Sequence, residues 1–362
     1  MRIEMISKLL ACCWLFISHL TCAGAVSTQL QSNSGTYPHK MRSVIQEIMN
    51  ASSVPFSGNI IVLEDGNTVY ELSIGENLNA HSSFVVASLS KQVTATLILQ
   101  AVDAGKLDLS QSLNSYLFSG ISNADNAQRY DERITLHHLL SHTSGVDALG
   151  KPVRFTPGSQ FQYSNLGYSL LGQVLEKVNK QPFSEQISQF AKDNTLNALY
   201  AKTGSIDTIQ QGLTSLATGL NEAQPPSPSN LVIDQALLPA GGLIASARAF
   251  ARFQELLHSG ALLDPKSYAL MTRAHTQMRF FWPNMHYGYG LRINLDDGLT
   301  ELSHTGYVEG YMSMSLHYPE FNVSVVMLEN LALSLDNIER VLELHTQIRD
   351  AVRKQLLSTQ NL

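Results

Sequence analysis

The sequence predicts an α/β protein of the α+β type, in which helices flank an antiparallel sheet and a helical lobe is inserted into it. Segments with strand patterns lie near both ends of the chain, at 59–74 and 287–328. Between them, from about 106 to 260, the patterns are mostly helical with irregular connections. A chain that runs from strands to helices and back to strands is typical of a sheet assembled from both ends. A length of 362 residues, 44% of them hydrophobic, is enough for a sizeable core.

The first 25 residues have the three parts of a secretory signal peptide. Arg2 and Lys8 supply the positive start, residues 9–20 are a short apolar stretch, and Ala-Gly-Ala at 23–25 is a small-x-small cleavage site. The apolar stretch is shorter than the ~20 residues of a membrane span. We therefore expect a mature protein of residues 26–362 without a stable membrane span, located in the bacterial periplasm or secreted.

All three cysteines, Cys12, Cys13 and Cys22, lie inside the predicted signal. The mature chain would therefore have no disulfide and no cysteine metal site. Lipid attachment at Cys22 is an open alternative, although residues 19–21 lack the small residue expected just before a lipidated cysteine.

The net charge of −6 comes without a basic block, so we expect no nucleic-acid partner. The expected partner is a small-molecule or peptide substrate.

The N-terminal part of the sheet is predicted to be a helix followed by a hairpin. Residues 38–51 have the spacing of an amphipathic helix. Two strands follow at 59–63 and 68–74, and the link between them contains the Asp-Gly pair of a tight hairpin.

The C-terminal part is predicted to complete the sheet. Its expected elements are strands at 290–293, 300–304, 311–317 and 323–328 and a final helix at about 336–357. The proline-rich segment 221–230 is predicted to be a surface loop or linker. Residues 26–362 would thus form a single domain, with a sheet lobe at about 38–88 and 285–362 and a helical lobe at about 89–284. A cleft between two such lobes is a common place for an active site.

A serine and a lysine lie one helical turn apart where an extended apolar run, 84–87, changes into a helix. Ser88 and Lys91 would share one helix face, so the amine can reach the hydroxyl. A serine is a weak nucleophile until a base takes its proton, and a desolvated lysine can be that base. Any helix start rich in Ser and Lys matches this pattern, so it predicts catalysis only together with other motifs.

Two later segments carry groups suited to the same chemistry. Tyr163 and Asn165 lie on a turn directly before a helix, where the tyrosine is either a buried aromatic or an acid–base group. His304, Thr305 and Gly306 close a predicted strand. The glycine would let a substrate backbone lie against the strand, and the histidine is a donor that can carry charge. The alternative is a strand-end turn with an incidental histidine.

In this order the three segments resemble the serine β-lactamase and penicillin-binding-protein superfamily, whose motifs are S-x-x-K, a second polar motif, and K-T-G or a variant. Tyr-x-Asn as the second motif is similar to the class C β-lactamase-like branch, with its D-alanyl-D-alanine carboxypeptidases, D-aminopeptidases and esterases. A histidine at 304 in place of lysine is closer to the peptidases and esterases. Family-like stretches at 139–145 and 240–246 extend the resemblance to roughly residues 38–350.

The resemblance implies the β-lactamase-like fold, no cofactor, no metal, and a role for each motif residue. Ser88 would be the acylated nucleophile and Lys91 its proton acceptor or electrostatic partner. Tyr163 would carry the proton to the leaving group and later activate water. The implied substrate-binding residues are Asn165, His304, Thr305, Gly306 and Tyr307. The backbone amides of Ser88 and Tyr307 would form the oxyanion hole.

We therefore expect a serine hydrolase that acts through an acyl-enzyme on D-amino-acid peptides, in the manner of a D-alanyl-D-alanine carboxypeptidase, or on small esters. A β-lactamase that hydrolyses β-lactam antibiotics is the first alternative. The second is a catalytically silent penicillin-binding-like sensor or binding module. The intact motifs argue against the silent module, which has no need of Lys91 or Tyr163.

The histidines permit two further expectations. His304 titrates near ~6.5 if its pKa is unperturbed, so a carboxylate substrate would bind more weakly above neutral pH. His138 and His142 have the spacing of a metal pair, but no zinc-protease glutamate follows them, and a structural role before Gly145 is favoured. The aromatic segment 280–289 is either core or a loop over the cleft.

Overall fold

The computed structural model describes residues 36–119 and 129–360. The predicted signal peptide, residues 1–25, lies outside the described residues, and so does Cys22. In the part of the chain that is described, none of the helices combines the length and the apolar character that crossing a membrane requires.

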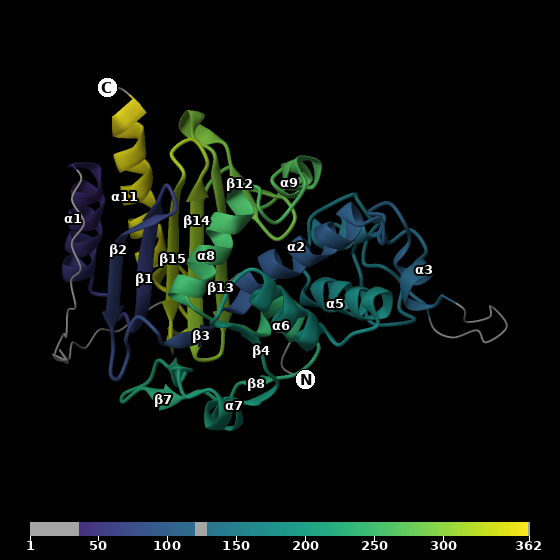
Figure 1. The fold of residues 1–362 in the computed structure, drawn as a ribbon, viewed down its shortest axis with the longest axis horizontal. Coiled ribbons are helices and arrows are strands. Elements are labelled where there is room, and N and C mark those ends of the chain that lie inside the picture. Colours follow the sequence, from purple (N-terminus) through teal and green to yellow (C-terminus); the bar gives the residue numbers. More distant parts are fainter. Residues whose placement is uncertain (1–35, 120–128, 361–362) are drawn as a thin grey trace.

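An eight-stranded antiparallel sheet forms one side of the molecule (Figure 1). It contains strands from both ends of the chain, which confirms the predicted assembly. From one edge to the other the strands are β10 (Thr276–Gln277), β11 (His286–Tyr287), β12 (Arg292–Asn294), β13 (Glu301–Val308), β14 (Tyr311–Tyr318), β15 (Val323–Glu329), β1 (Gly58–Glu64) and β2 (Asn67–Ile74).

Helices cover both faces of this sheet. In β1, Ile60 and Val62 point toward the layer of α1 (Thr36–Ala51) and α11 (Glu343–Gln360), whereas Ile61 and Leu63 point into the opposite core. That opposite face is covered by α8 (Ala247–His258), which packs against β1 and β15. Because both faces are buried there, β1 and β15 contain the continuous apolar runs 60–63 and 325–328 rather than an alternating pattern.

The remaining helices lie mainly on the side of α8 and extend away from the sheet (Figure 1). They are α2 (Ser90–Asp103), α3 (Leu113–Leu117), α4 (Leu136–Leu140), α5 (Asn165–Asn179), α6 (Phe183–Asp193), α7 (Ile206–Gly212) and α9 (Pro265–Met271), with the helical turns η2 (Ala87–Leu89) and η4 (Leu238–Gly242).

A small antiparallel sheet joins this helical region to the start of α2. It consists of β3 (Ser83–Val85), β9 (Leu243–Ser246) and β4 (Leu199–Ala201). The sequence analysis expected mostly helix at the last two, because strands this short have no readable periodicity. The remaining short strands are β5 (Gly204–Ser205), β6 (Leu220–Asn221), β7 (Ser227–Pro228), β8 (Val232–Ile233) and β16 (Leu331–Ala332).

Two predicted boundaries differ from the structure. The final helix is broken at Leu342 into α10 (Ile338–Val341) and α11, and Ile338 is 40% exposed. The strand expected to close at residues 304–306 continues to Val308, because it pairs with β14 along its whole length.

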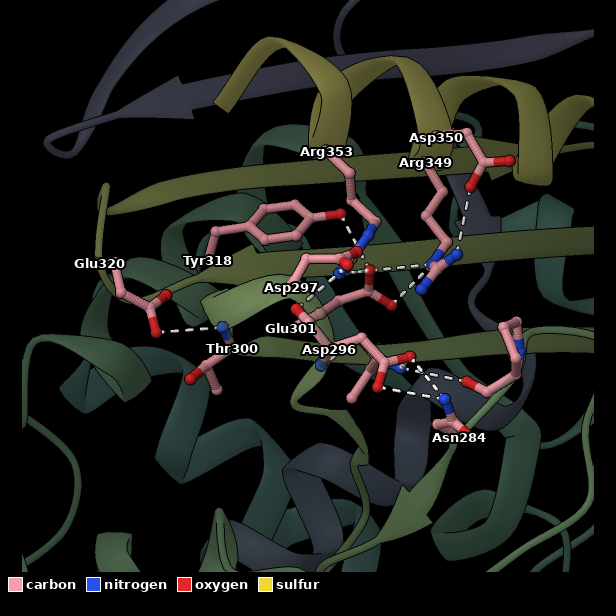
Figure 2. A network of polar contacts seen from close by, with 12 residues as sticks. Asn284, Asp296, Asp297, Thr300, Glu301, Tyr318, Glu320, Arg349, Asp350 and Arg353 are labelled. Carbon is pink, nitrogen blue, oxygen red and sulfur yellow. Dashed lines mark hydrogen bonds and ion pairs between the residues drawn. The ribbon is translucent and has the colours of Figure 1, made fainter. Parts of the chain in front are cut away.

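A buried ionic cluster connects α11 to the sheet (Figure 2). The Glu301 carboxylate, which is fully buried, accepts hydrogen bonds from Arg349 Nε at 2.8 and 2.9 Å and from the Tyr318 hydroxyl at 3.1 Å. Arg353 Nη1 lies 3.4 Å from the same carboxylate. The arginines of the helix and the carboxylate of the sheet neutralise each other, and neither element could bury its charge alone.

Candidate active site

Ser88 lies in the turn η2, between β3 and α2. It is the one residue from 82 to 99 that is not buried. The preceding residue, Ala87, has φ = +48°, a left-handed conformation that is unfavourable for a residue with a Cβ. Serine hydroxyls hold this turn in place: Ser90 Oγ donates to the Ala87 carbonyl at 2.7 Å and Ser313 Oγ to the Val86 carbonyl at 2.8 Å.

Neither of these serines was predicted from the sequence. Ser90 lies within the S-x-x-K motif, but nothing in the motif shows that its hydroxyl turns back to the chain. Ser313 comes from β14 and has no sequence signal of its own.

Ser88 and three further candidate residues lie together at the serine hydroxyl. Lys91 Nζ lies 3.3 Å from Ser88 Oγ, and the Tyr163 hydroxyl lies 2.8 Å from the same oxygen. Lys91 Nζ also donates to Asn165 Oδ1 at 2.9 Å and to the Ala240 carbonyl at 2.5 Å. Tyr163 and Asn165 reach the site because Ser164 caps the N-terminus of α5 through its side chain.

The environment shifts the pKa values of the lysine and the tyrosine in opposite directions. Burial lowers the pKa of the Lys91 ammonium well below its ordinary 10.5, and the nearby Arg292 guanidinium lowers it further. Tyr163 is 36% exposed as a whole, but its hydroxyl turns inward to Ser88, and burial there raises the pKa of the phenol to about 12. The site thus favours a neutral amine beside a protonated phenol.

The β13 residues border the serine, and Gly306 lies where β13 approaches η2 most closely. A Cβ on Gly306 would clash with Ser313 Oγ and would lie 2.8 Å from the Ala87 Cβ and 2.9 Å from the Ser88 backbone nitrogen. The glycine therefore allows β13 to pack directly against η2. The segments that carry the expected oxyanion-hole amides, at Ser88 and Tyr307, are consequently packed side by side.

The expectation of a titrating cation at His304 is wrong. The side chain is fully buried, Nδ1 donates to the Thr305 carbonyl at 2.7 Å, and Nε2 accepts from the Tyr287 hydroxyl at 3.0 Å. Burial holds the pKa of this imidazole well below 6.5, and the Arg292 guanidinium lowers it further. His304 is therefore neutral at neutral pH, and both ring nitrogens already have protein partners.

Arg292 of β12 is the permanent cation that the sequence analysis missed. It is 6% exposed, its guanidinium carbon lies 4.0 Å from the Phe280 ring centroid, and Nη1 donates to Thr305 Oγ1 at 2.8 Å. Its Nε has no hydrogen-bond partner among the described residues. An arginine in a strand at 290–293 gave no signal, because its proximity to residue 305 depends on the pairing of β12 with β13.

The other candidates are distributed between core and surface. His138 caps α4 together with Thr135. No group of three or more potential metal-ligating side chains occurs within residues 36–119 and 129–360. In the aromatic segment, Trp282 and Tyr287 are buried, whereas Phe281 is 49% exposed.

Known proteins match this chain in sequence and in fold. The family model described as Beta-lactamase matches residues 41–346. The chain is 25% identical over 313 residues to the putative penicillin-binding protein PbpX of Bacillus subtilis, covering 79% of this chain and 74% of PbpX. It is 22% identical over 343 residues to protein flp of Staphylococcus aureus, covering 84% of this chain but only 65% of the length of flp. Among solved structures, D-amino acid amidase from Ochrobactrum anthropi SV3 aligns with a TM-score of 0.69 at 17% identity, over 88% of this chain and 99% of the amidase.

Proposed function

Since this chain belongs to the beta-lactamase family, we propose that it is a serine hydrolase that forms an acyl-enzyme on Ser88. The observation that carries the proposal is the pair of contacts at Ser88 Oγ, with Lys91 Nζ at 3.3 Å and the Tyr163 hydroxyl at 2.8 Å. The proposal includes a periplasmic or secreted location, which rests on the N-terminal signal pattern alone.

Acylation follows from the two protonation states. With Lys91 neutral, its two N–H groups are directed to Asn165 Oδ1 and the Ala240 carbonyl, and its lone pair can accept the Ser88 proton. Ser88 Oγ bonds to the substrate carbonyl carbon while the proton moves to Lys91. As the bond to the leaving group breaks, the Tyr163 hydroxyl protonates the departing atom and regains a proton from the lysine. Water then cleaves the ester on Ser88 by the reverse proton path.

The proposed substrates are D-amino-acid peptides that end in a free carboxylate, with small esters as neutral substrates of the same site. Arg292 supports a carboxylate, because a guanidinium beside the Thr305 hydroxyl is a fixed anion-binding pair with an unpartnered Nε. The fold similarity to an enzyme named D-amino acid amidase is consistent with this substrate class.

Intact-mass spectrometry during incubation with a penicillin tests the acyl-enzyme, with Ser88→Ala as the control. A lasting adduct on the wild type alone would support a carboxypeptidase-like enzyme with slow deacylation. Consumption of the penicillin without an adduct would indicate a β-lactamase. If the wild type turns over neither penicillin nor esters nor D-aminoacyl amides, and Ser88→Ala binds ligand with unchanged affinity, the result would support the silent binding module.

Replacing Arg292 with methionine should lower kcat/KM for a D-peptide with a free carboxylate by roughly 10–100-fold, because a hydrogen bond to a charged group contributes ~1.5–3 kcal/mol. The methyl ester of the same peptide should be little affected. The measurement compares both substrates with wild type, Arg292→Met and the control Arg252→Met, which removes an exposed arginine paired with Glu255 on α8.

The carboxylate preference should also be constant from about pH 6 to pH 9, because a guanidinium stays protonated in that range and burial holds the pKa of His304 well below 6.5. A preference that survives Arg292→Met, or that disappears as pH rises through ~6.5, would return this role to His304.

A further inference from the structure

His142 contacts three consecutive residues around the candidate acid–base tyrosine. Its carbonyl accepts a hydrogen bond from the Gln162 amide at 2.8 Å, and its ring Nδ1 accepts one from the Ser164 amide at 3.1 Å. Between these two amides, the Tyr163 ring packs on the imidazole with 4.3 Å between the ring centroids. One buried side chain and its own carbonyl thus hold the segment that carries Tyr163.

The backbone of His142 is adapted to this double contact. Its φ is +58°, in the left-handed region that non-glycine residues rarely adopt. This conformation occurs in the turn after α4, where the carbonyl and the ring both reach the chain segment before α5. A strained residue that makes several contacts to a reacting group's own segment is a candidate for function.

The ring is neutral and correctly oriented for this contact. Because Nδ1 accepts from the Ser164 amide, the proton must lie on Nε2, which has no hydrogen-bond partner within the described chain. Burial lowers the pKa of His142 well below 6.5, and the nearby Arg292 guanidinium lowers it further. A protonated ring would turn an N–H toward the Ser164 amide and break the contact.

The surroundings of His142 come from several elements that also line the active site. The titratable and charged groups that face it are Lys91 of α2, Tyr163 before α5, Tyr168 of α5, Tyr287 of β11, Arg292 of β12 and His304 of β13. The imidazole therefore packs between the Tyr163 ring and the buried rings of Tyr168 and Tyr287, and it makes no hydrogen bond to Ser88 Oγ.

We propose that His142 is a positioning residue that holds Tyr163 with its hydroxyl at Ser88 Oγ, so that the phenol can protonate the leaving group. This inference rests on the proposed function and adds a residue to it. It predicts that loss of His142 weakens proton donation specifically, whereas a merely structural residue would lower all rates by the same factor.

The test compares kcat/KM for two neutral esters with the same acyl group, phenyl acetate and p-nitrophenyl acetate. Phenolate is the poorer leaving group and depends on the proton from Tyr163, whereas p-nitrophenolate departs with little help. His142→Asn keeps an acceptor and tolerates the left-handed backbone, while His142→Phe keeps the ring and removes the acceptor. General acid catalysis contributes about 10²–10⁴-fold, so we expect either variant to lose about tenfold more rate with phenyl acetate than with p-nitrophenyl acetate.

Two further variants complete the test. Tyr163→Phe should show the same selectivity for the better leaving group, and adding His142→Asn to it should cause little further loss, since both act on one proton transfer. His138→Asn is the matched control, because His138 caps α4 in the same segment but lies outside the contacts to residues 162–164. It should change both ester rates by equal factors.

Equal losses with both esters in the His142 variants, or losses that multiply in the double variant, would overturn the positioning role while the proposed function stands. If His142→Asn does not fold, His142→Phe carries the same comparison. A wild type without any hydrolytic activity would overturn the proposed function itself, and with it the role of His142.

Discussion

Replacing Lys91 with methionine should lower kcat/KM for p-nitrophenyl acetate by about 10³-fold or more, within the range that general acid–base groups contribute, while the protein stays folded. Lys91 Nζ is the basic atom that lies 3.3 Å from Ser88 Oγ, and the methionine side chain has a length similar to lysine but no basic group. Asn165 Oδ1 and the Ala240 carbonyl lose a donor, at ~1–3 kcal/mol each. Removal of a buried amine offsets part of that loss.

Steady-state kinetics and thermal unfolding check this prediction, with Lys177→Met as the control. Lys177 is exposed on α5, so its replacement makes the same lysine-to-methionine change without touching the site. A Lys91→Met enzyme within about tenfold of wild type would mean that another group takes the serine proton, against the usual size of such an effect.

The pH profile of the wild type shows whether Lys91 acts as a neutral amine or as an ammonium. Because the pKa of Lys91 is lowered, the neutral amine that accepts the serine proton is present above that lowered pKa and is lost as pH falls through it. Acylation should therefore be maintained at neutral pH and decline toward acid. A rate that instead keeps rising up to the ordinary lysine pKa of ~10.4 would show that the amine is protonated in the resting site.

Replacing Glu301 with glutamine should lower the free energy of unfolding by about 3–5 kcal/mol, since removing one partner of a buried ion pair leaves an uncompensated charge. Both Arg349 and Arg353 face this carboxylate, and their side chains are 6% and 8% exposed (Figure 2). Arg349 also lies over the Trp282 ring at 4.7 Å, so it cannot turn out to solvent without giving up that packing.

Urea unfolding measures this effect, and Asp350→Asn is the matched control. Asp350 pairs with the same Arg349 at 3.1 Å, but its side chain is 61% exposed. Exposed pairs contribute ~0.2–1 kcal/mol, so the control should hardly shift the transition. A Glu301→Gln protein as stable as the control would show that the two arginines find other partners or reach water.

Several features of this protein follow from local sequence patterns. The Asp-Gly pair between 59–63 and 68–74 predicted the hairpin of β1 and β2, because a two-residue turn depends only on its own backbone preferences. The spacing of Ser88 and Lys91 predicted their contact, since one helical turn fixes their separation. The local pattern predicted the polar turn before α5 as a helix start, whereas its partnership with Ser88 was predicted only through the family resemblance.

The charge states and the supports of the site depended on tertiary structure. His304 could be recognised as a motif residue, but its neutrality results from burial and from Arg292, which comes from a neighbouring strand. The contact of His142 with the segment of Tyr163 joins two turns that no periodicity relates. Sequence alone therefore determined which residues lie one turn or one hairpin apart. Only the packing of distant segments decided which of them are buried, and burial together with neighbouring charge sets their protonation.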